Sequence, residues 1–302
     1  MKFIDRLVTA IHEKNSVTCV GVDPVWERIP ADIIAEAEKT YGKTWEAAGS
    51  ALLEFGKGII DAVHDLVPAV KPQMAFFEQY GYYGLKAFEE LCAYAAEHGL
   101  LVIADGKRND IDSTAKAYAD AYLGETNLFG EKKAAFKIDA LTVSAYLGFD
   151  GIKPFTVNCD KFKKGIFVLV KTSNPSAGDL QDRYAEDGLR NFEYMAHFVE
   201  SWGADLIGDC GFSEVGAVVG ATYPKDIERL RSLMPTVFFL IPGYGAQGAS
   251  AKDIAAAFDK DGLGAVVNAS RSIIYAYEAA KTTDYKKAAR EATETMNRDL
   301  RG

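Results

Sequence analysis

The sequence predicts a parallel α/β fold, and within that class a single (β/α)8 barrel domain that spans residues 1–302. Three observations support this prediction. Continuous apolar runs, typical of strands buried on both faces, alternate with longer stretches of helical periodicity. Eight such units fit into 302 residues, a length that favours a closed barrel over an open sheet. Composition does not shift along the chain, so one domain is the simplest account.

The first half of the chain contains four predicted strands, separated by helix-like stretches. Residues 2–15 show the helical pattern clearly, because apolar side chains recur at helical spacing until Asn15 and Ser16 end it. Strands are predicted at residues 17–22, 67–70, 100–104 and 138–143, and further helices at 45–66, 77–98 and from 111 to about 124. Residues 25–44 are predicted to be irregular, and residues 125–137 to form a surface connection.

The second half of the chain continues the same alternation. Strands are predicted at residues 165–170, 217–220, 236–241 and 264–267, and helices at 189–202, 224–233, 251–258 and 272–298. One long connection interrupts this rhythm at residues 174–188. It is polar and contains glycine and proline, as a mobile lid would.

The overall composition restricts the classes of partner. Hydrophobic residues make up 48% of the chain and charged residues 25%, which is ordinary for a globular protein with a sizeable core. The net charge of −9 provides no general attraction to nucleic acid or anionic membranes. The four cysteines are far apart and form no CxxC pair, and neither a signal peptide nor a membrane-spanning run is evident. We therefore expect a cytoplasmic protein with reduced thiols and with neither nucleic-acid nor membrane partners.

The most informative stretch follows the strand predicted at residues 100–104. On a strand, residues two apart point to the same side, so Asp105 and Lys107 should project together from its C-terminal end. Asp110 should lie at or next to the cap of the following helix, with Thr114 one turn further on. A structural explanation is also open: Asp110 could be only a cap, and Asp105 and Lys107 an ordinary surface ion pair.

Several other polar residues follow predicted strands. Barrel enzymes build their active sites on the loops at the C-terminal ends of the strands. The residues expected at this mouth are Asp23, Lys71, Asp105, Lys107, Ser173, the loop at 242–248 and Arg271. Their convergence predicts an active site there.

The loop at 242–248, PGYGAQG, contains a G-x-G-x-x-G pattern between a strand and a helix. That is the setting of a dinucleotide-binding fingerprint, but Asn268 stands where such proteins place an acidic residue. In a barrel, the loops after strands seven and eight commonly bind phosphate through backbone N–H groups. Gln247 and Arg271 would add side-chain donors to that site.

A metal site is disfavoured by the residues at hand. The four histidines, at positions 12, 64, 98 and 197, are scattered over helical stretches and are expected to be surface or packing residues. Asp105 and Asp110 could in principle bind Mg²⁺, but Lys107 lies between them and Lys71 would add positive charge nearby. We therefore expect no metal ion at this site.

These residues together resemble the orotidine 5′-monophosphate decarboxylase family, in the longer form found among bacteria. The resemblance covers the chain from Val17 to Tyr275. The motifs that carry it are VGVDP at 20–24, the strand end at Lys71, ADGKRNDI at 104–111, TSNP at 172–175, PGYGAQG at 242–248 and NASRSI at 268–273. The D-x-K-x-x-D-I element in this setting is highly specific, whereas each other motif alone would be weak.

The resemblance implies a cofactor-free homodimer that converts orotidine 5′-monophosphate (OMP) to UMP and CO₂. Asp105 would lie against the substrate carboxylate, and Lys107 would deliver a proton to C6 of the pyrimidine. Asp110 and Thr114 would enter the neighbouring subunit's site across the dimer interface. Lys71 would complete this charge network.

The resemblance also implies how the rest of the substrate is bound. Lys71 and Asp23 would bind the ribose hydroxyls, and Ser173 would contact the pyrimidine. The loop from Pro242, with Gln247 and Arg271, would bind the phosphate.

The sequence departs from the family pattern in two respects. Ser270 stands where the family often has glycine before the phosphate-binding arginine, and the segments at 25–44, 125–137 and 174–188 have no assigned role. Two alternatives remain open. One is a Mg²⁺-dependent sugar-phosphate decarboxylase or aldolase of the same superfamily, which would carry an acidic metal ligand in place of Lys71. The other is a barrel that binds a nucleotide without turnover.

Overall fold

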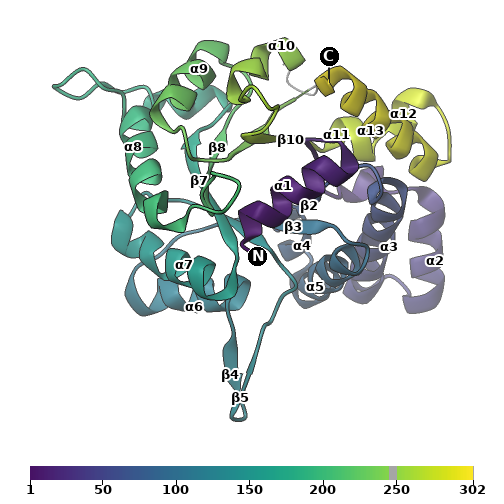
Figure 1. The fold of residues 1–302 in the computed structure, drawn as a ribbon. Coiled ribbons are helices and arrows are strands. Elements are labelled where there is room, and N and C mark those ends of the chain that lie inside the picture. Colours follow the sequence, from purple (N-terminus) through teal and green to yellow (C-terminus); the bar gives the residue numbers. More distant parts are fainter. Residues whose placement is uncertain (245–249, 302) are drawn as a thin grey trace. The chain divides into compact units, whose positions relative to one another are not determined.

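The computed structural model describes residues 1–244 and 250–301, and the predicted barrel class is confirmed. Within these residues, the parallel strands follow the order β1-β10-β9-β8-β7-β6-β3-β2 of a closed barrel. The barrel strands are β1 (Thr18–Val22), β2 (Ala69–Pro72), β3 (Leu101–Arg108), β6 (Ala140–Val143), β7 (Gly165–Lys171), β8 (Val215–Val219), β9 (Phe239–Pro242) and β10 (Ala265–Ala269). Figure 1 labels β2, β3, β7, β8 and β10 among them.

Helices lie between the strands, mostly where the periodicity predicts them. The α-helices are α1 (Phe3–Lys14), α2 (Ala31–Tyr41), α3 (Trp45–Val63), α4 (Ala75–Glu78), α5 (Gly81–Glu97), α6 (Asp112–Leu123), α7 (Phe149–Phe162), α8 (Asn191–Gly203), α9 (Pro224–Leu233), α10 (Ala251–Ile254), α11 (Arg271–Ile274), α12 (Ala276–Ala280) and α13 (Tyr285–Arg301). Short 3-10 helices are η1 (Trp26–Arg28), η2 (Pro175–Asp179), η3 (Ala204–Leu206) and η4 (Ala255–Ala257).

The prediction that residues 25–44 are irregular is wrong, because α2 lies within them. Its only large aliphatic side chains are Ile33 and Ile34, but Ile33 and Ala37 are four positions apart and pack on the alanine-rich start of α3. Thr44 then caps α3, since its hydroxyl oxygen accepts a hydrogen bond from the N–H of Ala47 at 3.2 Å. Tertiary packing thus stabilises a helix whose own sequence pattern is weak.

A second helix, α7, lies where the sequence pattern predicts no element. Pro154 stands inside it, and proline is unfavourable in a helix interior because it removes a backbone hydrogen bond. The buried residues Ile152, Phe155 and Cys159 nevertheless keep helical spacing and form its inner face. The fourth strand–helix unit of the barrel, β6 and α7, therefore has a complete helix.

The chain divides into two compact units, which are described separately; the predicted single domain stays a prediction. The first unit comprises Met1–Thr9, Lys107–Ala135 and Asp139–Asn268, and the second comprises Ala10–Gly106, Phe136–Ile138 and Ala269–Gly302. In the second unit, β1, β2 and β3 pair in parallel, with Gly21 opposite Lys71 and Val70 opposite Val102. Helix α3 packs against α2, α5 and α13 in the same unit.

In the first unit, β6 to β10 form a continuous parallel series. Its register is regular except at the end of β7, where it shifts between Leu169 and Lys171. A bulge of this kind interrupts the alternation of side chains and changes where they point. Val170 and Lys171 are both buried, at 3% and 2% exposure, as is usual where both faces of a strand are covered.

The segment at 125–137 contains an antiparallel hairpin of β4 (Thr126–Leu128) and β5 (Glu131–Lys133). Phe129 and Gly130 join the strands with positive φ angles of 53° and 88°, which suits a tight two-residue turn. Figure 1 shows the hairpin projecting away from α6 and α7. The surface connection predicted here thus has regular structure of its own.

No helix among the described residues is both long and apolar enough to cross a membrane.

A buried carboxyl group, Glu214, joins α1 to the start of β8 within the first unit. Its Oε1 accepts a hydrogen bond from the N–H of Phe3 at 3.2 Å, and its side chain is 1% exposed. Burial raises the pKa of Glu214 to about 7. The charged residues that act on it are Lys2, Lys163 and Asp160.

This geometry predicts a pH-dependent contribution to stability. The pKa of Glu214 is higher in the folded chain than in the unfolded chain, so its stabilising effect is complete at low pH and is lost as pH rises through about 7. Glu214→Gln still accepts from Phe3 but cannot ionise. Relative to the native chain, we expect the variant's free energy of unfolding to increase by about 1–3 kcal/mol as the pH is raised from about 5 to about 8. Urea unfolding at both pH values measures this change. The exposed Glu228→Gln should show no such gain, and an equal response of both variants would contradict the assignment.

Candidate functional site

A buried ion pair joins the C-terminal ends of β2 and β3 in the second unit. The Nζ of Lys71 lies 2.7 Å from Oδ2 of Asp105, and the two residues are only 4% and 7% exposed. The ends of β2 and β3 run in parallel register here, so that Gln73 lies opposite Asp105. Water is largely excluded from the pair, so its charges act on neighbouring groups with little screening.

Gln73 is part of this cluster, although it is not among the site residues predicted from the sequence. Its Nε2 donates a hydrogen bond to Oδ2 of Asp105 at 3.0 Å, and its Oε1 accepts from the N–H of Ala75 at 3.2 Å. The N–H of Met74 also donates to the carbonyl oxygen of Asp105, at 3.3 Å. Its spacing could have indicated this position, because Gln73 follows Lys71 by two residues and so points to the same side of the strand.

Asp23 adds a second negative charge beside Lys71. It directly follows β1, and its Oδ1 is buried with no hydrogen-bond partner among the described residues. Burial opposes the charged form of Lys71, but the charges of Asp105 and Asp23 outweigh that effect and raise its pKa above the usual range. The ammonium group therefore stays protonated, while Oδ1 of Asp23 can accept a hydrogen bond from a ligand hydroxyl.

The backbone that carries Asp23 is held by Tyr275. The hydroxyl of Tyr275 donates to the carbonyl oxygen of Asp23 at 2.9 Å and accepts from the N–H of Val25 at 2.6 Å. Its ring stacks on Phe55, with centroids 5.9 Å apart. Arg271, the predicted phosphate ligand, begins α11 four residues earlier in the same unit and is exposed.

Lys107 lies in the first unit, near the end of β3, and its backbone is not extended. Its φ angle is +46°, a left-handed value that non-glycine residues rarely adopt. Its N–H donates to Oγ1 of Thr142 at 3.0 Å, and the carbonyl oxygen of Arg108 accepts from Ser144 at 3.0 Å. The strand alternation used to predict the direction of its side chain therefore does not apply at this residue.

Asp110 lies next to the N-cap of α6, as predicted. The cap residue is Ile111, and Oδ1 of Asp110 accepts the N–H of Ile111 at 2.8 Å. Gly151 packs closely here, since a Cβ added to it would lie 2.7 Å from the carbonyl oxygen of Asp110. Thr114 is in the first turn of α6 and is exposed. The hydroxyl of Thr114 and the carboxylate of Asp110 therefore both lie near the N-terminus of α6.

The remaining predicted ligands are in the first unit. Ser173 follows β7 by two residues and lies against Gly220, where an added Cβ would be 3.1 Å from the Cβ of Ser173. Pro242 ends β9, and its carbonyl oxygen accepts from the N–H of Ala221 at 3.1 Å. Gln247 lies outside the described residues.

The structure therefore brings Lys71, Asp105 and Asp23 together in the second unit, where Arg271 also lies. The first unit holds Lys107, Asp110, Thr114, Ser173 and Pro242. Each described member of the predicted mouth stands at or just beyond the C-terminal end of its strand or in the first turn of the helix that follows. Their assembly into one site stays a prediction.

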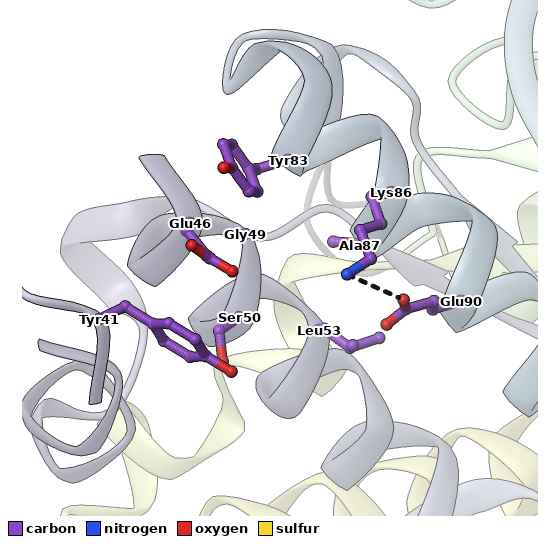
Figure 2. A pocket seen from close by; sticks show the side chains of 9 residues that line it. All are labelled: Tyr41, Glu46, Gly49, Ser50, Leu53, Tyr83, Lys86, Ala87 and Glu90. Carbon is purple, nitrogen blue, oxygen red and sulfur yellow. Dashed lines mark ion pairs between the residues drawn. The ribbon is translucent and has the colours of Figure 1, made fainter. Parts of the chain in front are cut away.

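Two pockets in the second unit contain none of the predicted site residues. Figure 2 shows the smaller one, of about 90 Å³, where Lys86 and Glu90 form an ion pair at 3.6 Å and Glu46 lies on the facing helix. The larger one, of about 370 Å³, is lined by Trp26, Ile34, Glu38, Gly42, Lys43, Thr44, Ala47 and Ala48. Over residues 1–244 and 250–301, no cluster of three or more histidine, cysteine or acidic residues is arranged to hold a metal ion.

Comparison with known proteins identifies the relatives of the chain. The model of the orotidine 5′-phosphate decarboxylase / HUMPS family matches residues 19–285. Proteins named orotidine 5′-phosphate decarboxylase from Caldicellulosiruptor bescii and Rhodopirellula baltica are each 46% identical to it, covering 99% and 100% of this chain and 98% and 100% of their own. The structure of Leishmania donovani OMP decarboxylase has a TM-score of 0.74 and 32% identity, with 100% of both chains covered.

The buried ion pair predicts a large stability effect from one substitution. Lys71→Met leaves the carboxylate of Asp105 buried without its cation, so we expect a loss of about 3–5 kcal/mol in the free energy of unfolding. Chemical denaturation measures this loss. Adding Asp105→Asn to the same variant should recover part of it, because no uncompensated charge then remains.

The exposed pair of Lys39 and Glu36 on α2 provides the matched control. Lys39→Met should cost less than about 1 kcal/mol, since exposed ion pairs contribute little. A similar small loss for Lys71→Met would contradict the interpretation of the buried pair.

Proposed function

Because this chain belongs to the orotidine 5′-phosphate decarboxylase / HUMPS family, we propose that it is a lyase that converts OMP to UMP and CO₂ in pyrimidine biosynthesis. The two relatives that are 46% identical carry the name of this activity and match the chain over nearly its whole length. The structural observation that carries the proposal is the buried pair of Lys71 and Asp105 at the ends of β2 and β3. It provides a fixed carboxylate on the strand that also carries Lys107.

The charge on Asp105 has a direct use in this reaction. A carboxylate held by Lys71 and Gln73 cannot turn away easily, because both contacts are hydrogen bonds in a buried setting. In the proposed mechanism, Asp105 faces the substrate carboxylate. The repulsion between the two anions falls as neutral CO₂ leaves, which favours the transition state over bound substrate.

Lys107 is assigned the second role. Loss of CO₂ leaves an electron pair at C6 with no good electron sink, so a positive charge beside C6 is the main stabilisation available. The ammonium of Lys107 supplies this charge and then donates a proton to C6, giving UMP. The positive φ at Lys107 and its backbone hydrogen bond to Thr142 support this assignment, because unusual backbone geometry concentrates at active sites.

The other residues bind the nucleotide in this proposal. Oδ1 of Asp23 and the ammonium of Lys71 hold the ribose hydroxyls, and Ser173 contacts the pyrimidine. The phosphate binds to the loop that begins at Pro242, with Gln247 and Arg271 as donors. Energy from phosphate binding would help close the loops over the base.

We also propose that the active enzyme is a homodimer, with Asp110 and Thr114 contributed to the neighbouring subunit's site. Support comes from the exposure of Thr114 and of Ile111, which is 44% exposed, at the start of α6. Their exposure leaves both side chains accessible to a neighbouring subunit. The two carboxylates, Asp105 and Asp110, would then belong to different chains in each site.

No cofactor enters this mechanism. The competing Mg²⁺-dependent activity would need an acidic metal ligand in place of Lys71. The raised pKa of that buried ammonium opposes cation binding there. The free thiols are consistent with the cytoplasm as the place of the reaction, since Cys19, Cys92 and Cys159 are buried and Cys210 is partly buried.

The first test is turnover of OMP by the purified protein, followed by its absorbance change. We expect activity that EDTA does not reduce, because the proposed mechanism uses no metal. Lys107→Ala should lower kcat by at least about 10³-fold, since it removes both the stabilising charge and the proton donor. Activity lost in EDTA and restored by Mg²⁺ would favour the sugar-phosphate alternative. Binding of UMP without any turnover would favour a non-catalytic barrel.

The shared site gives a separate test. Lys107→Ala and Asp110→Asn homodimers should both be nearly inactive. A heterodimer of the two variants should regain roughly half of the native activity, because one of its two sites contains both native residues. Tagged chains co-purified as verified heterodimers allow this measurement. If such heterodimers remain inactive, Asp110 does not act in the neighbouring site.

A further inference from the structure

A second buried lysine, Lys171, lies at the end of β7 in the first unit, and the proposed mechanism does not use it. It is 2% exposed, and its ammonium forms an ion pair with Asp182. The same ammonium lies 4.9 Å from the ring centroid of Phe192 and 5.3 Å from that of Tyr223. A charge this deeply buried is retained only where specific partners compensate its desolvation.

Lys171 is the last residue of β7, just after the register shift that follows Leu169. Val170 and Lys171 are both buried, as are most residues of this strand. The carbonyl oxygen of Lys171 also accepts a hydrogen bond from the N–H of Gly220 at 2.8 Å. The ammonium of Lys171 thus pairs, at the end of the strand, with a carboxylate of the segment that follows it.

Asp182 belongs to the connection at 174–188, the segment with the sequence character of a lid. Its side chain is 42% exposed, so only one partner of the ion pair is deeply buried. The neighbouring Gln181 provides a second link to the strand end. Its Oε1 accepts the N–H of Thr172 at 2.9 Å, and its Nε2 donates to Oγ1 of Thr172 at 2.7 Å.

These two links hold the two residues that precede Ser173, the expected pyrimidine ligand. Thr172 on one side is bound to Gln181, and its Oγ1 also donates to Oδ1 of Asn174 on the other side at 2.6 Å. Gly220 lies against Ser173, and a side chain larger than that of glycine would not fit at position 220. The conformation of Ser173 is therefore fixed from both flanks by a segment that the ion pair holds in place.

We propose that the ion pair of Lys171 and Asp182 is a positioning element that anchors the connection at 174–188 to the end of β7 and thereby orients Ser173 toward the substrate. This inference rests on the proposed function, because Ser173 needs a pyrimidine to contact. Asp182 acts through Ser173 and does not touch the substrate itself. Its effect is therefore on substrate binding rather than on the chemical step.

The test compares two substitutions of Asp182 with a matched control. Asp182→Asn removes the charge that Lys171 needs, whereas Asp182→Glu keeps it. Asp160→Asn makes the same change in an exposed pair with Lys163 and serves as the control. Asp182 is partly exposed, so all three variants should fold, and thermal unfolding verifies this.

Steady-state kinetics with OMP is the main readout. We expect Asp182→Asn to raise KM about tenfold, because the orienting conformation of Ser173 becomes a minority state, while kcat changes by less than about threefold. Asp182→Glu should restore most of the native KM, and the control should match the native protein.

Limited trypsin digestion gives an independent readout of the anchor. The exposed Arg183 follows Asp182 directly, so loss of the ion pair should speed cleavage after it by about tenfold. Unchanged KM and cleavage in Asp182→Asn would overturn the proposal, and so would faster cleavage with a native KM. A native protein that does not turn over OMP would overturn the proposed function, and this inference with it.

Discussion

The buried pair of Lys71 and Asp105 is the interaction on which the candidate site depends. Moving two charges out of water is costly, and the pair is favourable only because the strands place the ions 2.7 Å apart and Gln73 satisfies Asp105 further. The register of β2 against β3 therefore determines whether this ion pair can form. A slip of one residue would turn Lys71 to the opposite face of the sheet and leave Asp105 uncompensated.

The barrel class was predictable because the hydrophobic signal is strong where strands are buried on both faces. β1 illustrates this, since all five of its residues are buried. The failures occur where packing rather than pattern determines structure. Helix α2 forms because Ile33 and Ala37 pack on α3, and α7 forms in spite of Pro154. Neither compensation is visible in a local window of sequence.

The candidate site was predictable to the extent that charge at a strand end marks it. Lys71, Asp105 and Asp23 were found in this way. Gln73 could not be predicted in this way, because its side chain is a neutral amide. Its spacing of two residues from Lys71 was the available indication. The direction of Lys107 was beyond prediction, since its left-handed φ is fixed by contacts such as that to Thr142, which is distant in sequence. Local spacing predicts direction only where the backbone stays extended.

The two buried lysines show how one kind of ion pair can serve two purposes. Asp105, the partner of Lys71, is itself buried on a strand, so neither charge can be hydrated without unfolding part of the sheet. Asp182, the partner of Lys171, is 42% exposed and belongs to a connecting segment. Water can hydrate that carboxylate without any part of the sheet unfolding, although the buried ammonium of Lys171 would then lose its counterion. The first pair is thus suited to hold a charge rigidly through a reaction. The second ties a connecting segment to the strand end, because only its carboxylate lies on that segment.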